Sequence, residues 1–202
     1  AYVALPGGID VPEIMDSRAT YLGAKLGGYA GRRLERGDRV GCARIAAASS
    51  LRLPERHRPP VGGSADVRIV LGPQQDYFTD EAVATLLGQP YFVSLESNRV
   101  GYRLDGPRLG YRVPVDLLSD GMLPGALQVP PGGQPIVIMP DGPTTGGYPK
   151  IGGIVQPDLR RIAQAQRGEA IRFRAIAWDA AHTAARGEAA YIAGLRFEPV
   201  PA

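Results

Sequence analysis

The sequence contains few of the residues on which disulfides and metal sites depend. Among its 202 residues, one is cysteine, Cys42, and two are histidine, His57 and His182. A single cysteine cannot form an intramolecular disulfide, and no paired Cys or His spacing matches a zinc site. The sequence therefore predicts no bound metal, and its scarcity of cysteine favours a reducing compartment, the cytoplasm.

Long hydrophobic runs and a strong net charge are also missing. No segment reaches the roughly 18 continuous apolar residues of a membrane-spanning helix, and the first ten residues lack a signal-peptide pattern. The formal net charge is only +3, and the basic residues are scattered. Their densest group, residues 52–58, has no interleaved aromatic residues of the kind that bind nucleic acid. These features predict a soluble cytoplasmic protein without a membrane or nucleic-acid partner.

Glycine and proline, in contrast, are abundant. The 27 Gly and 19 Pro fall between short apolar stretches without a fixed period, which is typical of a chain with many tight turns. Thr79 is a candidate N-cap for a helix that ends near Leu87, and further short helices are expected at 158–166 and 180–188. Strands are expected at residues 67–71, 91–95, 100–104, 135–139 and 171–176. The predicted fold class is mainly β with short helices, in the form of a closed barrel capped by helices.

Composition divides the chain into three parts. A β-prone run at residues 2–5 opens the sequence, and recurrent glycines between residues 17 and 40 disfavour a helix. Residues 46–65 are rich in Ala, Ser, Arg, Pro and Gly with little periodicity, as linkers are. We therefore expect an N-terminal segment at 1–45, which the resemblance described below identifies as a remnant of another module, a linker at 46–65 and a main domain at 66–202.

The segment with the most chemistry is the loop GPTTGGYPKIG, residues 142–152, which follows a predicted apolar strand. Its glycines permit close backbone approach, and its hydroxyls, backbone N–H groups and Lys150 could converge on a carboxylate, carbamoyl or phosphate group. The loop lacks the Gly-Lys-Ser/Thr end of a Walker motif. Composition alone leaves equally open a tight structural turn whose Tyr and Thr side chains satisfy buried backbone groups.

At this loop the sequence resembles a known family, the C subunit of 5-oxoprolinase, also called allophanate hydrolase subunit 2, within the biotin-dependent carboxyltransferases. The stretch after the loop fits the same signature, through Ile154, Asp158, Leu159, Arg161, Ala163, Gln164 and Gly168. Further stretches resemble family motifs in the same order: YVALPGGIDVP at 2–12, GPQ at 72–74, GYRLDG at 101–106 and LPGALQVP at 123–130. The resemblance thus extends along nearly the whole chain.

This resemblance implies a fold and an assembly. It implies a cyclophilin-like β-barrel for residues 66–202, preceded by an N-terminal β segment of a truncated second module. It also implies association with a B-subunit (KipI-like) homologue and, in 5-oxoprolinases, with an A subunit, so that 5-oxoproline is opened with ATP hydrolysis. In urea carboxylase-like enzymes the fused pair forms the carboxyltransferase domain. We accordingly expect a small amide substrate (5-oxoproline, urea or allophanate), ATP within the assembly, and biotin only in a carboxyltransferase-like enzyme.

The resemblance also favours particular site residues. Catalytic roles are predicted for Lys150, Thr144 and Thr145. Substrate binding is predicted for Arg99, Arg103, Gln128, Gly146, Gly147 and Tyr148. An arginine fork matches a carboxylate, Gln and Thr can hydrogen-bond an amide, and a lysine can neutralise negative charge that develops on a carbonyl or phosphoryl oxygen. Asp141 is expected either to orient Lys150 or to cap the turn.

The sequence offers no strong general base or nucleophile. His57 and His182 are each expected to be satisfied or solvated, and nothing beside Cys42 would lower its pKa. The base or nucleophile is therefore expected from a partner. A non-catalytic regulatory protein that binds a B-subunit homologue remains the alternative function, and peptidyl-prolyl isomerisation would rest on fold analogy alone.

Overall fold

The computed structural model describes residues 5, 7–42, 51–115 and 117–199. The chain forms two compact units, one of residues 1–54 with 197–202 and one of residues 55–196. We call them the N-terminal unit and the barrel unit. The division into domains at residues 45 and 65 stays a prediction.

The N-terminal unit is built from short ladders and turns. Strand β1 (Ile9–Asp10) pairs with β2 (Gly41–Cys42), β3 (Leu51–Arg52) pairs with β13 (Glu198–Pro199), and η1 is a 3₁₀ turn (Leu22–Ala24). Arg32 donates two hydrogen bonds to the Asp38 carboxylate, at 2.7 and 2.8 Å. These bonds, with a third from the Glu35 backbone, lower the pKa of Asp38 to about 2.

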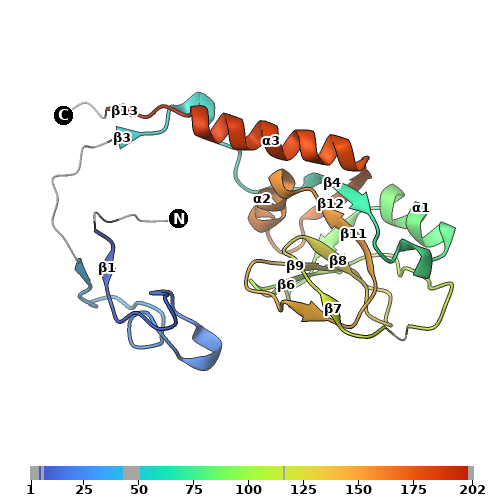
Figure 1. Cartoon of the computed structure of the whole chain (residues 1–202), viewed down its shortest axis with the longest axis horizontal. Helices are drawn as coiled ribbons and strands as arrows, with labels where there is room; N and C mark the ends of the chain where they lie inside the picture. The colour runs from blue at the N-terminus through green and yellow to red at the C-terminus, as the bar shows by residue number, and fades with distance from the viewer. Residues whose placement is uncertain (1–4, 6, 43–50, 116, 200–202) are drawn as a thin grey trace. The chain divides into compact units, whose positions relative to one another are not determined.

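Seven strands of the barrel unit form a closed barrel (Figure 1). Around the barrel they are β11 (Lys150–Ile154), β4 (Ala65–Leu71), β12 (Ala170–Ala175), β5 (Tyr91–Val93), β6 (Gly101–Asp105), β9 (Ile136–Ile138) and β8 (Ala126–Gln128). Strand β8 returns to β11 and closes the ring. The pair β4–β12 is parallel and the other barrel pairs are antiparallel. The predicted fold class, a mainly β chain with a closed barrel, is confirmed.

The barrel unit also contains helices and short elements outside this ring of strands. They are α1 (Asp80–Gly88), α2 (Gln156–Gln164), α3 (Trp178–Gly194), the 3₁₀ turns η2 (Glu55–His57) and η3 (Gln75–Tyr77), and a separate ladder of β7 (Asp120–Gly121) with β10 (Thr145–Gly146). The hydroxyl of Thr79 accepts the Ala82 N–H at 3.1 Å, which confirms the predicted N-cap. Helix α3 has 17 residues and extends beyond the expected 180–188 at both ends. The sequence of this alanine-rich helix has only weak apolar periodicity, and Ala181 is the one residue of the helix that is buried.

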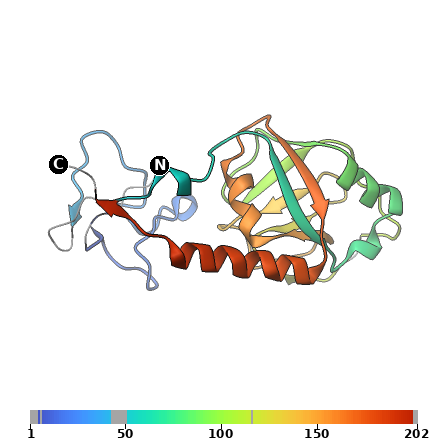
Figure 2. The same cartoon turned by 90° about the horizontal axis from the view of Figure 1, so that it is seen from above.

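Alternation of side chains along β4 and β12 separates the core from an outer polar face. Val67 and Ile69 are fully buried, as is Ile171, and Phe173 is 3% exposed. Figure 2 shows β4 and β12 side by side, and the residues between these inward positions point outward. Helices α1 and α2 add Leu86 and Ile162 to the same core, together with other buried residues of the barrel unit.

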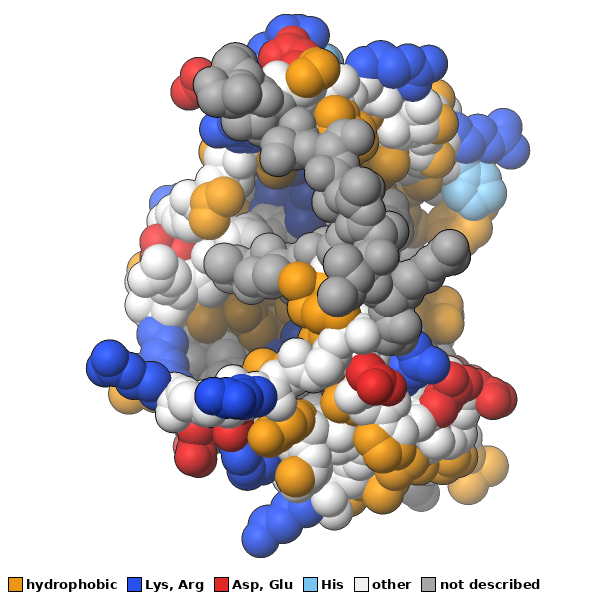
Figure 3. Space-filling model, turned by 90° about the vertical axis from the view of Figure 1, so that its left-hand side faces the viewer, with side chains coloured by type: hydrophobic (Ala, Val, Ile, Leu, Met, Phe, Trp, Pro, Cys, Tyr) orange, Lys and Arg blue, Asp and Glu red, His pale blue; other side chains and the backbone are white. Residues whose placement is uncertain are grey.

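Charged side chains of both signs are present on the face of the molecule that Figure 3 shows. Figure 3 shows one face of the molecule, on which Lys and Arg side chains lie interspersed with acidic and hydrophobic ones. Over the described ranges, every helix is too short or too polar to cross a bilayer.

An ion pair fastens α2 to the outside of β4. Asp158 accepts hydrogen bonds from the Arg68 side chain at 2.7 and 2.8 Å and from the Arg68 backbone N–H at 2.8 Å. The side chain of Asp158 is 5% exposed and that of Arg68 is 30% exposed. Burial opposes ionisation of Asp158, but the hydrogen bonds from Arg68 outweigh it, so the pKa of this carboxyl is lowered.

Replacement of this carboxylate should destabilise the barrel unit. We expect Asp158→Ala to lower the free energy of unfolding by about 2 kcal/mol, because Arg68 loses a partly desolvated partner. The folded-state pKa of Asp158 is lowered. The ionised carboxylate therefore contributes its full stabilisation above the unfolded-state pKa of about 3.9, and this stabilisation is lost as the pH falls through the folded-state pKa. Urea unfolding should therefore give a lower free energy of unfolding for the variant than for wild type at neutral pH, and equal values in acid.

The matched control is Glu96→Ala, which removes an ion pair with Arg103 on the surface of the same unit. The Glu96 side chain is 77% exposed, so this change should have little effect on stability at either pH. Equal stability of Asp158→Ala and Glu96→Ala would contradict the importance given to the Arg68–Asp158 pair.

Candidate functional site

The barrel unit contains a concave pocket of about 660 Å³. It lies between the ends of β4, β7, β8 and β11 and one face of α3. We call it the Lys150 pocket, and the lining residues that matter below are Asp120, Leu123, Lys150, Gly153, Trp178 and His182. Apart from Asp120, Lys150 and a few polar neighbours, the walls of this pocket consist mostly of aliphatic side chains and backbone, as in many small-molecule sites.

Lys150 is a buried cation at one end of this pocket. Its side chain is 7% exposed, and its Nζ donates to Asp120 Oδ2 at 2.7 Å. The Lys150 backbone N–H donates to the side-chain oxygen of Gln74 at 3.1 Å. The register of β11 against β8 shifts between Lys150 and Gly152, and such a bulge changes the direction of a side chain. The bulge therefore lies directly beside Lys150, whose side chain lines the pocket.

The predicted functional loop holds Asp120 opposite this lysine. Strand β10 lies in that loop and pairs with β7, so that Gly146 faces Asp120 and Thr145 faces Gly121. The Met122 N–H also donates to the Thr144 carbonyl at 2.8 Å. Backbone hydrogen bonds of the loop therefore position the carboxylate partner of Lys150.

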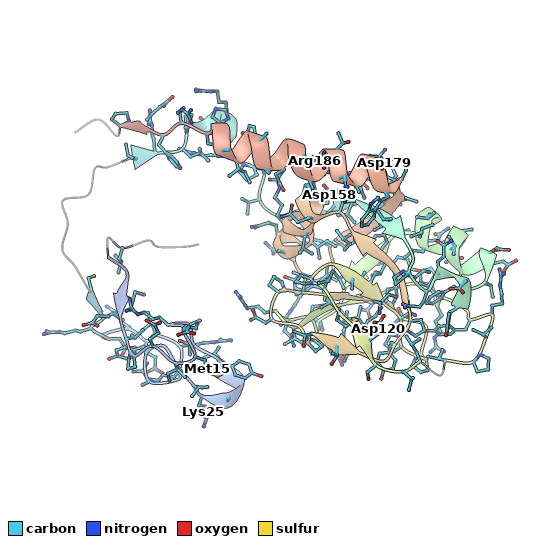
Figure 4. All side chains as sticks on the ribbon, in the orientation of Figure 1. Met15, Lys25, Asp120, Asp158, Asp179 and Arg186 are labelled. Carbon is cyan, nitrogen blue, oxygen red and sulfur yellow. The ribbon has the colours of Figure 1, made fainter. Side chains whose placement is uncertain are left out.

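The ion pair keeps Asp120 ionised. The hydrogen bond from Lys150 and, to a smaller extent, the one from the Gly121 N–H lower the pKa of Asp120. The Asp120 side chain is 54% exposed, whereas that of Lys150 is almost inaccessible. Figure 4 labels Asp120 on the barrel unit, where this open carboxylate can accept hydrogen bonds from a ligand.

Helix α3 supplies an aromatic part of the pocket wall. The rings of Trp178 and His182 are 4.7 Å apart between centroids and tilted by 48°. Both side chains are exposed, and between them Ala181 packs inward with a small side chain. Tilted aromatic rings next to small residues provide a surface for a flat ligand.

Two adjacent glycines in β11 have different surroundings. A Cβ at Gly152 would lie 2.8 Å from the Val70 carbonyl oxygen, closer than two such atoms approach. A Cβ at Gly153 would meet no atom within 4 Å. Gly152 is therefore needed for close strand packing, whereas Gly153 leaves open space where it lines the pocket.

The structure separates Lys150 from the other predicted loop residues. Of the nine predicted site residues, all of them described, the pocket is lined by Lys150 alone. Thr144, Thr145 and Tyr148 are exposed. The φ of Gly147 is not positive, and a Cβ there would find ordinary contacts at 3.5 Å or more, so this position does not require glycine. Catalytic roles for the two threonines and binding roles for Gly146, Gly147 and Tyr148 stay predictions.

The predicted residues outside the loop lie in different places. Gln128 is half-buried on β8 and pairs with Lys150 in the strand register. Arg103 is exposed and lies 3.6 Å from Glu96. Arg99 donates to Asp141 at 2.6 and 3.0 Å, and these hydrogen bonds lower the pKa of Asp141. The expectation that Asp141 might orient Lys150 is therefore wrong, because this carboxylate is taken up by Arg99 while Lys150 pairs with Asp120.

Sequence reasoning missed Asp120, Trp178 and His182 as neighbours in one site. Asp120 is 30 residues away from Lys150 and reaches it only through the β7–β10 ladder. His182 is exposed, consistent with its expected solvation, but it also lies at the pocket beside Trp178. A Trp and His four residues apart on a helix share one face, which is the signal that could have paired them. Among the described residues, no three His, Cys, Asp or Glu are grouped as a metal site requires.

Comparison with known proteins gives the family. The model of the carboxyltransferase domain, subdomain A and B, matches residues 1–175. The chain belongs to this carboxyltransferase-domain family. It is 39% identical over 173 residues to the 5-oxoprolinase C subunit of Escherichia coli (strain K12), and the match covers 86% of this chain and 55% of that protein. The resemblance inferred from the sequence motifs is confirmed.

Other relatives extend the family to larger proteins. Identity is 32% over 195 residues to the 5-oxoprolinase C subunit of Haemophilus influenzae, with 96% of this chain and 62% of that protein covered. The solved structure of Kluyveromyces lactis urea carboxylase matches with a TM-score of 0.79 and 27% identity, over 92% of this chain and 18% of that one. The carboxyltransferase-domain chain thus spans just over half the length of the bacterial proteins it matches.

Removal of the Lys150 ammonium should change the titration of Asp120. We expect Lys150→Met, which keeps a similar length in a buried position, to raise the pKa of Asp120 toward the ordinary aspartate value of about 3.9. Carboxyl-detected NMR titration of the Asp120 side chain measures this change. Arg112→Met, which removes the partner of Asp80 instead, serves as the control and should leave Asp120 unaffected. An identical Asp120 titration in wild type and Lys150→Met would show that the pair does not form in solution.

Proposed function

We propose that this carboxyltransferase-domain chain is a component of an ATP-dependent amide-processing assembly, either a 5-oxoprolinase or a related amide hydrolase or carboxyltransferase. We propose further that the Lys150 pocket binds the small amide, with 5-oxoproline as the first candidate and urea and allophanate as the others. The observation that supports this is the pair of a buried Lys150 with an exposed Asp120 in a largely apolar pocket. The 39% identity to the Escherichia coli 5-oxoprolinase component supports the choice of substrate class.

The ion pair offers complementary groups to an amide. Lys150 Nζ can donate to the amide carbonyl oxygen, and Asp120 can accept from the amide N–H. When the carbonyl is attacked, negative charge grows on its oxygen, and an ammonium in an apolar pocket stabilises that charge better than water does. The rings of Trp178 and His182 offer a surface for the flat lactam ring of 5-oxoproline.

From the same residues we infer which cofactor of the assembly the Lys150 pocket could hold. In the Lys150 pocket the ammonium is already paired and Asp120 would repel phosphate oxygens, so this pocket does not fit a triphosphate. A ureido group has the same carbonyl and N–H pattern as an amide, so Lys150 and Asp120 would hold the ring of biotin if the assembly were a carboxyltransferase. Biotin would supply the carboxyl group for transfer only after it had been carboxylated on its ureido ring elsewhere in the assembly.

This proposal includes partners. We propose a B-subunit (KipI-like) homologue as the direct partner and an A-subunit homologue as a further component, with the attacking group or general base supplied by one of them. The reason is chemical: Lys150 lowers the pKa of Asp120, so this carboxylate of the pocket is a weak base.

Variants of the pocket test the proposal in the assembly reconstituted with its A-type and B-type partners. We expect Gly153→Val to raise the KM for 5-oxoproline at least tenfold, because its side chain enters the open space of the pocket without a clash. We expect Lys150→Met to lower kcat at least tenfold, because the developing charge loses its ammonium. ATP-dependent 5-oxoproline hydrolysis provides both constants, and thermal unfolding of each variant verifies the fold.

Gly132→Val is the matched control, since Gly132 also has no atom within 4 Å of an added Cβ and does not line the pocket. It should leave KM and kcat unchanged. Unaltered kinetics for both Gly153→Val and Lys150→Met would remove the pocket from the proposal. An assembly that forms but hydrolyses none of 5-oxoproline, urea and allophanate would favour a regulatory binding partner instead.

A further inference from the structure

The outer face of β4 and β12 bears a cluster of guanidinium groups. Together with α2, these strands form a groove of about 470 Å³. We call it the Arg groove, and its charged lining residues are Asp66, Arg68, Asp158, Arg161, Arg172 and Arg174. It shares no lining residue with the Lys150 pocket, and Figure 4 shows Asp158 and Asp120 well apart on the barrel unit.

The parallel register of the two strands explains how this cluster forms. Arg172 lies beside Asp66, and Arg174 lies beside Arg68. Because Phe173 points into the core, Arg172 and Arg174 both point outward, where they are exposed. Their positions on β12 are about 7 Å apart along the strand, and their long side chains can converge on neighbouring groups of one ligand.

The charges of the Arg groove are not balanced. Asp158 is fully engaged by the side chain and backbone of Arg68, so this pair is neutral. Arg161 donates one hydrogen bond to the Asp66 carbonyl oxygen at 3.3 Å and lies 3.9 Å from Asp158. Within the described part of the chain, the Arg172 and Arg174 side chains make no hydrogen bond or ion pair. Four guanidinium groups therefore face two carboxylates, which leaves two positive charges.

We propose that the Arg groove binds a small ligand that carries a chain of two or more phosphate groups. Guanidinium forks match phosphate oxygens with paired hydrogen bonds, and Arg172 and Arg174 have their donors available. Like charges on neighbouring strands repel one another, and a bridging anion would remove this repulsion. A single phosphate would leave much of the groove empty, whereas a diphosphate or triphosphate can reach both exposed arginines and Arg161.

This site has the opposite chemistry to the Lys150 pocket. Its lining is charged, its cations outnumber its carboxylates, and a neutral amide would gain little from it. The proposal therefore does not depend on the function proposed for the Lys150 pocket, and loss of either would leave the other in place.

Calorimetric titration of the 202-residue protein with pyrophosphate at low ionic strength tests the proposal. We expect saturable binding of pyrophosphate and of ATP, and much weaker binding of inorganic phosphate. Arg172→Ala combined with Arg174→Ala should weaken pyrophosphate binding at least tenfold, and the corresponding double lysine variant should lose less, because it keeps the charge without the fork. Both side chains are exposed, so the melting temperature of each variant should remain that of wild type.

Arg108→Ala provides the control, because Arg108 is an exposed arginine of the barrel unit outside the groove. It should bind pyrophosphate as wild type does. If the protein binds ATP no more tightly than pyrophosphate, the phosphate chain is the part of ATP that it recognises. The proposal would be overturned by the absence of binding to pyrophosphate and ATP, by equal weakening in Arg108→Ala, or by glutarate binding as tightly as pyrophosphate.

Discussion

The pairing of β11 with both β4 and β8 is the constraint on which the rest of the structure depends. It closes the barrel, and it requires glycine at position 152, where a Cβ would meet the Val70 carbonyl oxygen. The same strand begins with Lys150, and the register shift next to it accompanies the burial of that side chain at the pocket. Closure of the barrel and placement of the cation are thus consequences of one set of backbone hydrogen bonds.

A lysine buried at this position needs a partner, since removal of its charge from water costs several kcal/mol in the absence of compensation. The GPTTGG loop meets that need indirectly. Its backbone pairs with β7 and presents Asp120 to Lys150, while the threonine side chains remain exposed. The loop therefore has a structural role, since its backbone positions Asp120, and its functional role stays a prediction.

Much of the fold could be predicted from the sequence because its signals are local. The β-prone runs at 67–71 and 171–176 predicted strands, and Thr79, as a candidate N-cap, predicted the start of α1. The site was predictable only in part. Lys150 stands out within an unusual loop, but Asp120 lies in a short segment without periodicity, and the carboxylate nearest in sequence to the loop, Asp141, pairs with Arg99 instead.

The sequence by itself determined the family, through motifs spread along the chain, and the β-rich class, through short apolar runs separated by glycine and proline. Only the tertiary structure decided which charges meet. The alternation of residues 172 and 174 is visible in the sequence, but their alignment with Asp66 and Arg68 follows from a parallel pairing across more than a hundred residues. Side-chain direction is a property of a few neighbouring residues, whereas strand register is set by the packing of the whole barrel, and charged sites at strand borders depend on that register.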